Sequence, residues 1–470
     1  MRRKERQLYR WIYSRSVYPL YHSIIRSGAL RRIRELDLHD RLSRDELGKI
    51  EQEKLHSLLL YARSNVPYYR NVIPADILSD PAGIDDDAFR AIPILTKDVI
   101  RRELQGLVSE SLEGNRLDAN STSGSTGSPL TFFTDTRSKS YRKAAVVRNR
   151  RWLGIEVGDP VARLWGSAID EKRAESFRGC LHSRVTRELF LSAYRLDDAH
   201  LASYASRIRQ HKAKLLIAYP SVLVEFGRFC HRNSLDLPSL EAIICSAECL
   251  HSHQREAIEN YLSTPVYNRY GCREVGDIAH EVPDSEGLFV NSDRIHIEII
   301  DSAGKPCVPG EVGDILVTDL DNYGMPLIRY FIGDRGSWSP GTGNHGRLPY
   351  PVLEKVEGRS LDLVVCPSGN RVGGTFWTIL LRNRPGIENF KVVQMSLHSL
   401  CIEFTRLQDA PEIDYAYFRE KIAETCGPQM NVEFKEVSNL SASPGEKFRL
   451  VVSEVRDAVS DGDDESRSLQ

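Results

Sequence analysis

One short segment of the chain combines hydroxyl-bearing residues with glycine and holds no large side chain. Ser121–Pro129 reads Ser-Thr-Ser-Gly-Ser-Thr-Gly-Ser-Pro. Glycine lets backbone N–H groups close on a ligand without a Cβ in the way, and the hydroxyls add donors, so we expect a polyphosphate site. No Gly-Lys-Ser/Thr follows, which excludes a Walker loop. A flexible linker is the alternative, but a strand-like run, Thr131–Thr134, follows at once.

Two further segments place a carboxylate beside glycine. Tyr270–Glu274 follows a strand-like run, and its glycine permits a tight turn that lifts Arg273 and Glu274 into a cleft. Glu274 could then hold a hard cation such as Mg²⁺, and Arg273 could meet a phosphate. In Tyr330–Gly336, Asp334 stands between two glycines and could accept both hydroxyls of a ribose. The alternatives are a surface Arg–Glu pair and a plain hairpin turn.

Two segments toward the C-terminus suggest that one domain moves relative to the other. Val356–Asp362 contains Gly358 and Arg359 and lies where the pattern of expected strands and helices changes. Its small and polar residues suit a hinge between two domains. Ser441–Arg449 carries Lys447 on a glycine-containing loop, from which it could bind a carboxylate and a phosphate together. An ordinary linker and a solvated lysine are the alternatives.

The elements between these motifs predict an α/β protein with two domains. Strand-like runs at 162–165, 215–219, 242–245 and 265–268 alternate with helix-like segments such as 138–152 and 197–212. This alternation favours a largely parallel α/β core, preceded by a helix over 45–63. Residues 287–338 change to short strands and turns, which favours an antiparallel subdomain.

The domain prediction has three parts. We expect residues 1–357 to form a large N-terminal domain that holds the expected phosphate site and 358–456 a small, mobile α+β domain that carries Lys447. That small domain has a hairpin at 391–394 and 400–404, a helix over 414–426 and a strand over 431–437. We expect the acidic residues 457–470 to be disordered.

Composition narrows the class of protein. The chain has 470 residues, 41% apolar and 27% charged, with a net charge of -2, so no general attraction to nucleic acid follows. Nine scattered cysteines favour reduced thiols, and no apolar run could span a bilayer, so we expect a cytoplasmic protein. The basic, aromatic residues 1–34 predict an arm packed on its own domain or, as a homodimer, on a second subunit; peripheral membrane contact is the alternative.

The order of the motifs resembles the adenylate-forming superfamily, which includes acyl-CoA synthetases and peptide-synthetase adenylation domains. The motifs follow one another in the family's order: the phosphate loop, Tyr-Gly-x-x-Glu, Tyr-x-x-Gly-Asp, the Gly-Arg hinge and the late lysine loop. Asn65–Arg70 and Pro93–Lys97 are similar to the N-terminal signature of the phenylacetate–CoA ligase-like branch, which includes CapK-type capsule-locus members. Tyr219-Pro220-Ser221 and Ala247-Glu248 resemble that branch's acid- and adenine-side loops.

The resemblance implies a two-step reaction. A carboxylate attacks the α-phosphate of Mg-ATP, giving an acyl-adenylate and pyrophosphate, and a thiol or amine then displaces AMP. CoA is the acceptor we favour. An amine such as an amino sugar in polysaccharide biosynthesis, a non-catalytic nucleotide-binding homologue and a nucleotidyltransferase are the alternatives.

The resemblance also implies roles for single residues. Lys447 bridges carboxylate and α-phosphate, Glu274 binds Mg²⁺, and Arg359 belongs to the hinge. The expected nucleotide contacts are Ser123, Gly124, Ser125, Thr126, Gly127, Glu248, Tyr270, Gly271, Arg273 and Asp334.

Three departures from the family pattern touch these roles. Arg273 stands where most relatives have Thr or Ser, Ser128 stands where Lys is common, and Lys447 does not directly follow the glycine of its loop. The first two bear on phosphate and metal contacts, and the third bears on the lysine's geometry.

Two smaller predictions concern the acid pocket and zinc. Tyr141, Trp165, Tyr219 and Phe226 are the candidates for the acid pocket, whose substrate the sequence does not specify. Five Cys and His residues lie close in sequence: Cys245, Cys249, His251, His253 and Cys272. Their spacing matches no standard zinc pattern, so we expect free thiols.

Overall fold

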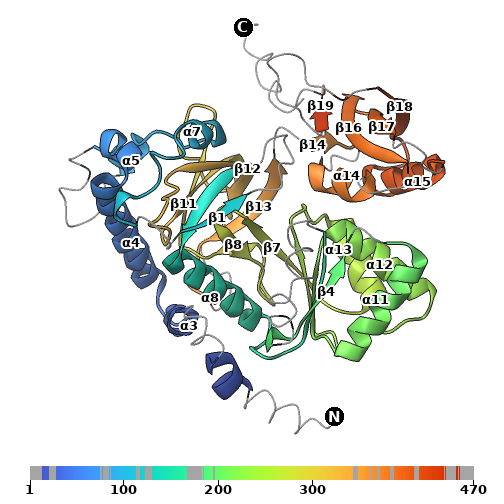
Figure 1. The fold of residues 1–470 in the computed structure, drawn as a ribbon, viewed down its shortest axis with the longest axis horizontal. Coiled ribbons are helices and arrows are strands. Elements are labelled where there is room, and N and C mark those ends of the chain that lie inside the picture. Colours follow the sequence, from blue (N-terminus) through green and yellow to red (C-terminus); the bar gives the residue numbers. More distant parts are fainter. Residues whose placement is uncertain are drawn as a thin grey trace, which may run out of the picture. The chain divides into compact units, whose positions relative to one another are not determined.

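The computed structural model of the chain separates into two compact units, the second of which begins at Arg359. It describes residues 13–20, 28–74, 77, 84, 86–112, 117–121, 130–166, 183, 185–193, 196–341, 348–359, 363–367, 371–381, 386–406, 412–438, 440, 451–453 and 455. Figure 1 labels the helices and strands of both units.

Parallel strands form one half of the eleven-stranded sheet in the described part of the first unit. Their order is β4 (Glu188–Ser192), β3 (Val161–Trp165), β5 (Leu215–Ala218), β6 (Ala242–Ser246) and β7 (Val266–Cys272). Every residue of β5 and β6 is buried, as expected for strands covered on both faces. The parallel strands expected from the sequence are therefore confirmed.

Helices link these strands and begin at recognisable residues. α11 (Asp198–His211) is capped by Asp197, whose carboxylate accepts from the His200 N–H, and α12 (Pro220–Arg232) has proline in its first turn. α13 (Ser252–Leu262) packs on α12, and Figure 1 shows these three helices together in green. α8 (Thr136–Trp152) follows the hairpin of β1 (Leu117–Ser121) and β2 (Thr131–Asp135).

Antiparallel strands form the other half of the sheet. From β7 outward they are β8 (Gly276–His280), β9 (Leu288–Val290), β13 (Val352–Arg359), β12 (Tyr330–Trp338), β11 (Gly313–Asp319) and β10 (Ile295–Ile300). The expected antiparallel subdomain is thus present. β13, the last of these in sequence, lies between β9 and β12.

The two glycine–carboxylate motifs lie in strands to a greater extent than the sequence suggests. β7 continues through Cys272, so the turn is Arg273–Val275. Gly333 and Asp334 lie within β12, where a register shift opposite β11 leaves extra residues bulged out and Gly333 has a φ of +98°. The alternative of a plain hairpin turn at this motif is therefore excluded, because β12 continues its pairing beyond the bulge, and such bulges re-aim side chains.

N-terminal helices pack on the first unit. They are η1 (Tyr13–Val17), α3 (Ala29–His39), α4 (Arg44–Asn65), α5 (Pro67–Val72), α6 (Asp86–Arg90), α7 (Lys97–Arg102) and η3 (Glu110–Leu112). Ser43 and Glu46 form a capping box for α4, and Thr96 caps α7. The buried Tyr13 packs with Ile33 and Tyr141, so the described part of the arm packs on its own unit.

The second unit has its own core. It contains β14 (Leu363–Val365), β15 (Arg371–Gly373), α14 (Gly374–Leu381), β16 (Ile387–Ser396), β17 (Ser399–Arg406), α15 (Tyr415–Cys426), β18 (Asn431–Glu436) and β19 (Val451–Ser453). The strand order β18-β17-β16-β19 includes the expected β16–β17 hairpin. Trp377, Phe404 and Ile422 are buried at its centre.

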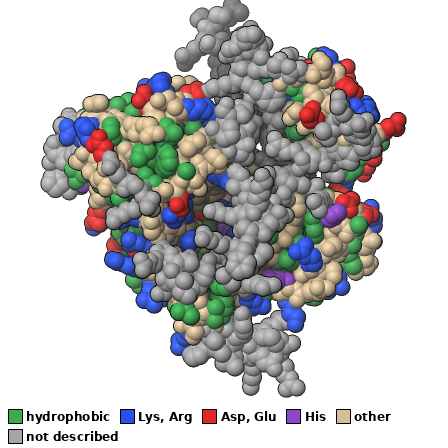
Figure 2. Space-filling view, in the orientation of Figure 1, with side chains coloured by type: hydrophobic (Ala, Val, Ile, Leu, Met, Phe, Trp, Pro, Cys, Tyr) green, Lys and Arg blue, Asp and Glu red, His purple; other side chains and the backbone are tan. Residues whose placement is uncertain are grey.

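The described surface carries mixed charge. On the face seen in Figure 2, Lys and Arg side chains are interspersed with Asp and Glu, in keeping with the net charge of -2. No described helix is both long enough and apolar enough to cross a membrane.

Candidate functional site

Two pairs of tyrosine and carboxylate connect the motifs that the sequence singled out. The Tyr270 hydroxyl donates to Oδ2 of Asp334 at 3.0 Å. The Tyr330 hydroxyl donates to Oε1 of Glu274, also at 3.0 Å. Each motif therefore supplies the tyrosine that binds the other motif's carboxylate, and two segments about sixty residues apart in sequence form one site.

The turn that carries Glu274 is held close to β8. A Cβ on Gly271 would lie 2.5 Å from the carbonyl oxygen of Gly276, so only glycine allows this approach. Glu274 is 4% exposed and accepts the Tyr330 hydrogen bond, but it forms no ion pair with any described residue. Burying a carboxylate without a counter-charge is costly. The residue therefore fits a ligand of Mg²⁺, which proteins bind through one or two carboxylates plus substrate phosphates.

Asp334 projects from the bulge in β12 and lies against Tyr270. Burial raises the pKa of the Tyr270 phenol well above its usual value, and the neighbouring Asp334 carboxylate adds to the shift. The phenol therefore stays protonated and fixes Oδ2 of Asp334. This arrangement sets the direction of the carboxylate that the sequence assigned to a ribose.

Glu248 joins the loops that follow β5 and β6. The backbone N–H and the hydroxyl of Ser221, in the first turn of α12, donate to its two oxygens at 3.1 and 3.0 Å. Burial raises the pKa of Glu248 to about 7, and the Ser221 hydrogen bonds oppose that shift. Ala247, just before it, has a φ of +68°, a strained value that is typical of functional loops.

Cys249 lies near the carboxylates of both Glu248 and Asp334. Burial raises the pKa of the Cys249 thiol to about 12, and the nearby carboxylates of Asp334 and Glu248 add to it. The structure thus gathers Glu248, Tyr270, Glu274 and Asp334 at the carboxyl ends of the parallel strands, where open α/β sheets bind ligands. Neither Tyr330 nor Cys249 was expected at the nucleotide site from the sequence. In both motifs a tyrosine precedes the acidic residue by four positions, and this shared spacing is the sequence signal that singles out Tyr330.

Two of the four acid-pocket candidates lie at this edge of the sheet. The rings of Trp165 and Tyr219 stack with centroids 4.4 Å apart, at the ends of β3 and β5. The other two do not join them. Phe226 is fully buried within α12. Tyr141 lies under Arg32 and Lys54 and donates to Glu35, because its position on α8 faces the N-terminal helices.

Residues of the N-terminal signature support β12. The Leu95 N–H donates to the Arg329 carbonyl and the Leu95 carbonyl accepts from Phe331, each at 3.0 Å. The Lys97 ammonium donates to the Ile332 carbonyl at 3.2 Å, within the bulge that precedes Asp334. This signature therefore contributes to the shape of the strand that presents Asp334.

Some predicted site residues lie outside the described part of the chain. These are Ser123, Gly124, Ser125, Thr126, Gly127 and Lys447, and also Ser360 to Asp362 of the expected hinge. Arg359 is described only as the last residue of β13. The described strands β1 and β2 bracket the first of these segments.

The expected thiols and the zinc alternative can be compared with the structure. Within the ranges given above, no cluster of three or more His, Cys, Asp or Glu side chains could hold a metal ion. Cys245, Cys249 and Cys272 are free thiols, and His251 stacks on His253 at 5.7 Å.

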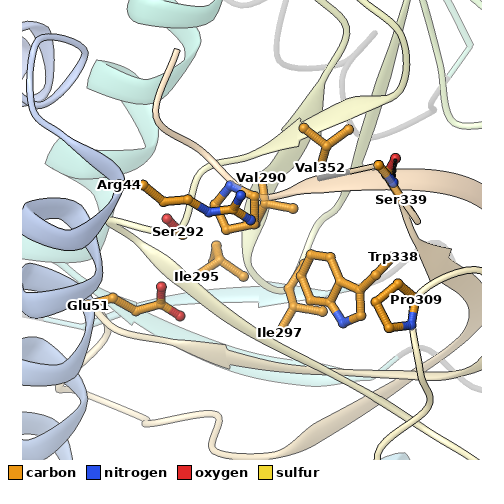
Figure 3. A pocket seen from close by; sticks show the side chains of 12 residues that line it. Arg44, Glu51, Val290, Ser292, Ile295, Ile297, Pro309, Trp338, Ser339 and Val352 are labelled. Atoms are coloured by element: carbon orange, nitrogen blue, oxygen red, sulfur yellow. Dashed lines mark hydrogen bonds between the residues drawn. The ribbon is translucent and has the colours of Figure 1, made fainter. Parts of the chain in front are cut away.

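A separate cavity of about 340 Å³ lies between α4 and strands β9, β10, β12 and β13 (Figure 3). Arg44 and Glu51 border it from α4, and Ile297 and Trp338 form part of its apolar wall. Glu51 is already paired with His296 at 2.7 Å. None of the predicted site residues that the structure describes lines this cavity, so it is distinct from the site formed by Tyr270, Glu274 and Asp334.

The known proteins that are similar in sequence include CapK and phenylacetate-coenzyme A ligases. No family model matches the chain. Protein CapK of Staphylococcus aureus is 22% identical over 419 residues, covering 88% of this chain and 90% of that protein. Phenylacetate-coenzyme A ligase of Escherichia coli (strain K12) is 24% identical over 345 residues, covering 70% of this chain and 75% of the ligase.

Solved structures agree on the fold. A crystal structure of 2-hydroxyisobutyryl-CoA ligase with 2-HIB-AMP and CoA has a TM-score of 0.60 at 18% identity, covering 88% of this chain and 91% of that chain. The same ligase in an open conformation gives 0.57. The chain is thus similar in sequence to CapK and to phenylacetate-coenzyme A ligases, and it shares the fold of 2-hydroxyisobutyryl-CoA ligase. The resemblance to the phenylacetate–CoA ligase-like branch of the adenylate-forming superfamily and the fold class expected from the motifs are confirmed.

Proposed function

We propose that this chain activates a carboxylic acid with ATP and transfers the acyl group to CoA. A carboxylate oxygen attacks the α-phosphorus, the bond to the β-phosphate oxygen breaks, and pyrophosphate leaves with its electron pair. The CoA thiol then loses its proton and attacks the acyl carbon, and AMP leaves with the electrons of the broken C–O bond. The similarity to phenylacetate-coenzyme A ligases and the shared fold support this reaction.

The observation that carries the proposal is the reciprocal pairing of Tyr270 with Asp334 and of Tyr330 with Glu274. A site for adenylation needs a carboxylate for the ribose and one for the cation of Mg-ATP, held at fixed separation. The two hydrogen bonds hold both carboxylates in one site before the substrate binds, which is the preorganisation that positioning catalysis requires.

The proposed roles follow from these contacts. Asp334, oriented by the Tyr270 hydroxyl, accepts the ribose hydroxyls. Glu274 holds Mg²⁺, which supplies charge neutralisation at the ATP phosphates when bound. Ser123 to Gly127 hold the phosphates with main-chain donors, and the pair Trp165 and Tyr219 borders the acid. Glu248 holds Ser221, and through it the start of α12, beside this border.

The second unit is proposed as the lid. We place the hinge at Gly358 to Asp362 and expect Lys447 to reach the carboxylate and α-phosphate during adenylation, as a cation that neutralises both. The division of the chain into units at Gly358 and Arg359 supports this position of the hinge.

Two successive assays test the proposal, one for pyrophosphate exchange and one for the product. A panel of aromatic and aliphatic acids is incubated with ATP, Mg²⁺ and ³²P-pyrophosphate, and acids that support exchange are then incubated with CoA or an amino sugar. An acyl-CoA mass supports the proposal. Acid-dependent AMP release that ignores CoA and requires an amine would replace the acceptor with the amine. Binding of ATP without any exchange would favour a non-catalytic homologue.

A further inference from the structure

We propose that Arg142, on α8, is the positioning residue for the turn that carries Glu274, and that it sets the affinity of this site for the cation of Mg-ATP. The proposal rests on the function proposed above. Arg142 belongs to none of the recognised motifs, and in sequence it reads as one of several basic residues on a helix.

The guanidinium of Arg142 binds the backbone of this turn at two consecutive residues. Nη1 donates to the Arg273 carbonyl at 3.0 Å, and Nη2 donates to the Glu274 carbonyl. Both carbonyls are fixed by one planar group, so the backbone of Glu274 cannot rotate without breaking a charge-assisted bond. The guanidinium binds no side-chain oxygen of Glu274, and no cation among the described residues pairs with that carboxylate.

Arg142 is itself held from three sides. Nη2 also donates to Oδ2 of the fully buried Asp319 at 3.2 Å, and Nε donates to the Ser138 hydroxyl at 3.1 Å. Its stem lies on β8, because a Cβ on Gly276 would come within 3.1 Å of its Cγ. Because the guanidinium is hydrogen-bonded to α8 and Asp319 as well as to the turn, the Arg142 side chain holds the turn at a fixed distance from α8.

The same helix is tied to β2, which closes the hairpin around the expected phosphate loop. Asp135, at the end of β2, caps α8 by accepting from the Ser138 N–H at 2.7 Å, and also accepts from the N–H groups of Tyr323 and Gly324. α8 therefore fixes the end of β2 and the Glu274 turn relative to each other. Arg142 supplies the second of these two attachments.

The test compares Arg142→Lys and Arg142→Ala with Arg151→Ala, a control on the same helix that removes contacts to Asp37 and Glu156 far from the turn. Lysine keeps the charge but cannot bind two carbonyls and Asp319 in one plane. Mn²⁺ binding to each protein with a non-hydrolysable ATP analogue is measured by electron paramagnetic resonance. The Mg²⁺ dependence of ATP–pyrophosphate exchange is measured in parallel.

We expect both Arg142 variants to bind Mn²⁺ about 10- to 100-fold more weakly, as is usual for residues that orient metal ligands, with Arg151→Ala unchanged. At saturating Mg²⁺, Arg142→Lys should recover most of the wild-type exchange rate. Unchanged Mn²⁺ affinity in a folded Arg142→Lys protein would overturn the proposal. If the wild type binds Mn²⁺ and the analogue but shows no exchange with any acid, the proposed function fails while the Mn²⁺ comparison still decides the role of Arg142.

Discussion

The Tyr330 hydroxyl donates to Oε1 of Glu274 at 3.0 Å and joins the first residue of β12 to the turn after β7. Four residues farther along β12, Asp334 receives the hydroxyl of Tyr270, four residues before Glu274. The carboxylate of each motif thus depends on the other motif for its orientation. Loss of either hydroxyl should disturb one carboxylate and leave the other in place.

The first prediction concerns this pairing. Tyr330→Phe removes a donor to a buried carboxylate and should lower ATP–pyrophosphate exchange about 10- to 100-fold, since hydrogen bonds to charged groups contribute roughly 1.5–3 kcal/mol. Glu274→Gln should cost roughly 100-fold or more. Tyr267→Phe, on the same strand as Tyr270, is the control. A Glu274→Gln rate equal to that of the wild type at low Mg²⁺ would exclude Glu274 as the metal ligand.

The second prediction concerns Lys447. Lys447→Ala should lower exchange by roughly 100- to 1,000-fold, because the lysine neutralises charge that develops during adenylation. ATP affinity, measured by calorimetry, should change little. Lys435→Ala is the control, since that exposed lysine pairs with Glu403 on β17. Parallel losses of activity in both variants would indicate damage to the second unit and not loss of a catalytic lysine.

The third prediction concerns the pH dependence of stability. The pKa of Glu248 is about 7 in the folded protein, against an ordinary value of 4.5. Between these values the native state holds a proton that the unfolded chain has lost, so wild-type stability falls as pH rises through this window. Glu248→Gln cannot ionise. Its free energy of unfolding relative to wild type should therefore rise, on the order of 1–3 kcal/mol, between pH 4.5 and 7.5.

Urea denaturation at several pH values measures this difference. Glu110→Gln is the control, because Glu110 is exposed and pairs with the exposed Arg70. A difference between Glu248→Gln and wild type that stays constant with pH would show that Glu248 titrates at an ordinary value.

The fourth prediction concerns a buried ion pair. The guanidinium of Arg148 is fully buried and binds Asp293 at 2.5 and 3.0 Å and Asn291 at 2.7 Å. Burial alone would raise the pKa of Asp293, but Arg148 holds it below its usual range. Arg148→Met removes the guanidinium from a buried carboxylate whose other side-chain contact is His39 at 2.9 Å, and should cost about 3–5 kcal/mol.

Thermal and urea unfolding of Arg148→Met provide the measurement. Arg70→Met breaks an exposed pair with Glu110 and should cost about 0–1 kcal/mol. Equal losses in the two variants would contradict the assignment of Arg148 to a buried pair.

The sequence predicted the parallel strands because fully buried strands such as β5 and β6 are nearly continuous apolar runs. It also predicted that Glu274 and Asp334 serve one site, through the order of the motifs. It did not predict the bulge at Gly333, because a bulge depends on the register with β11. Arg142 and Arg148 have no local signal either, since α8 is rich in Arg, Lys and Ser and reads as a solvated helix.

The position of β13 has a consequence for synthesis of the chain. β13 is the last strand of the first unit to leave the ribosome, yet it lies between β9 and β12, where Val352 pairs with Phe289. Until it emerges, the growing chain carries two partial sheets, each with an open edge. Open edges invite pairing with other chains, so this enzyme is most prone to misassembly in the interval before residues 352–359 are made.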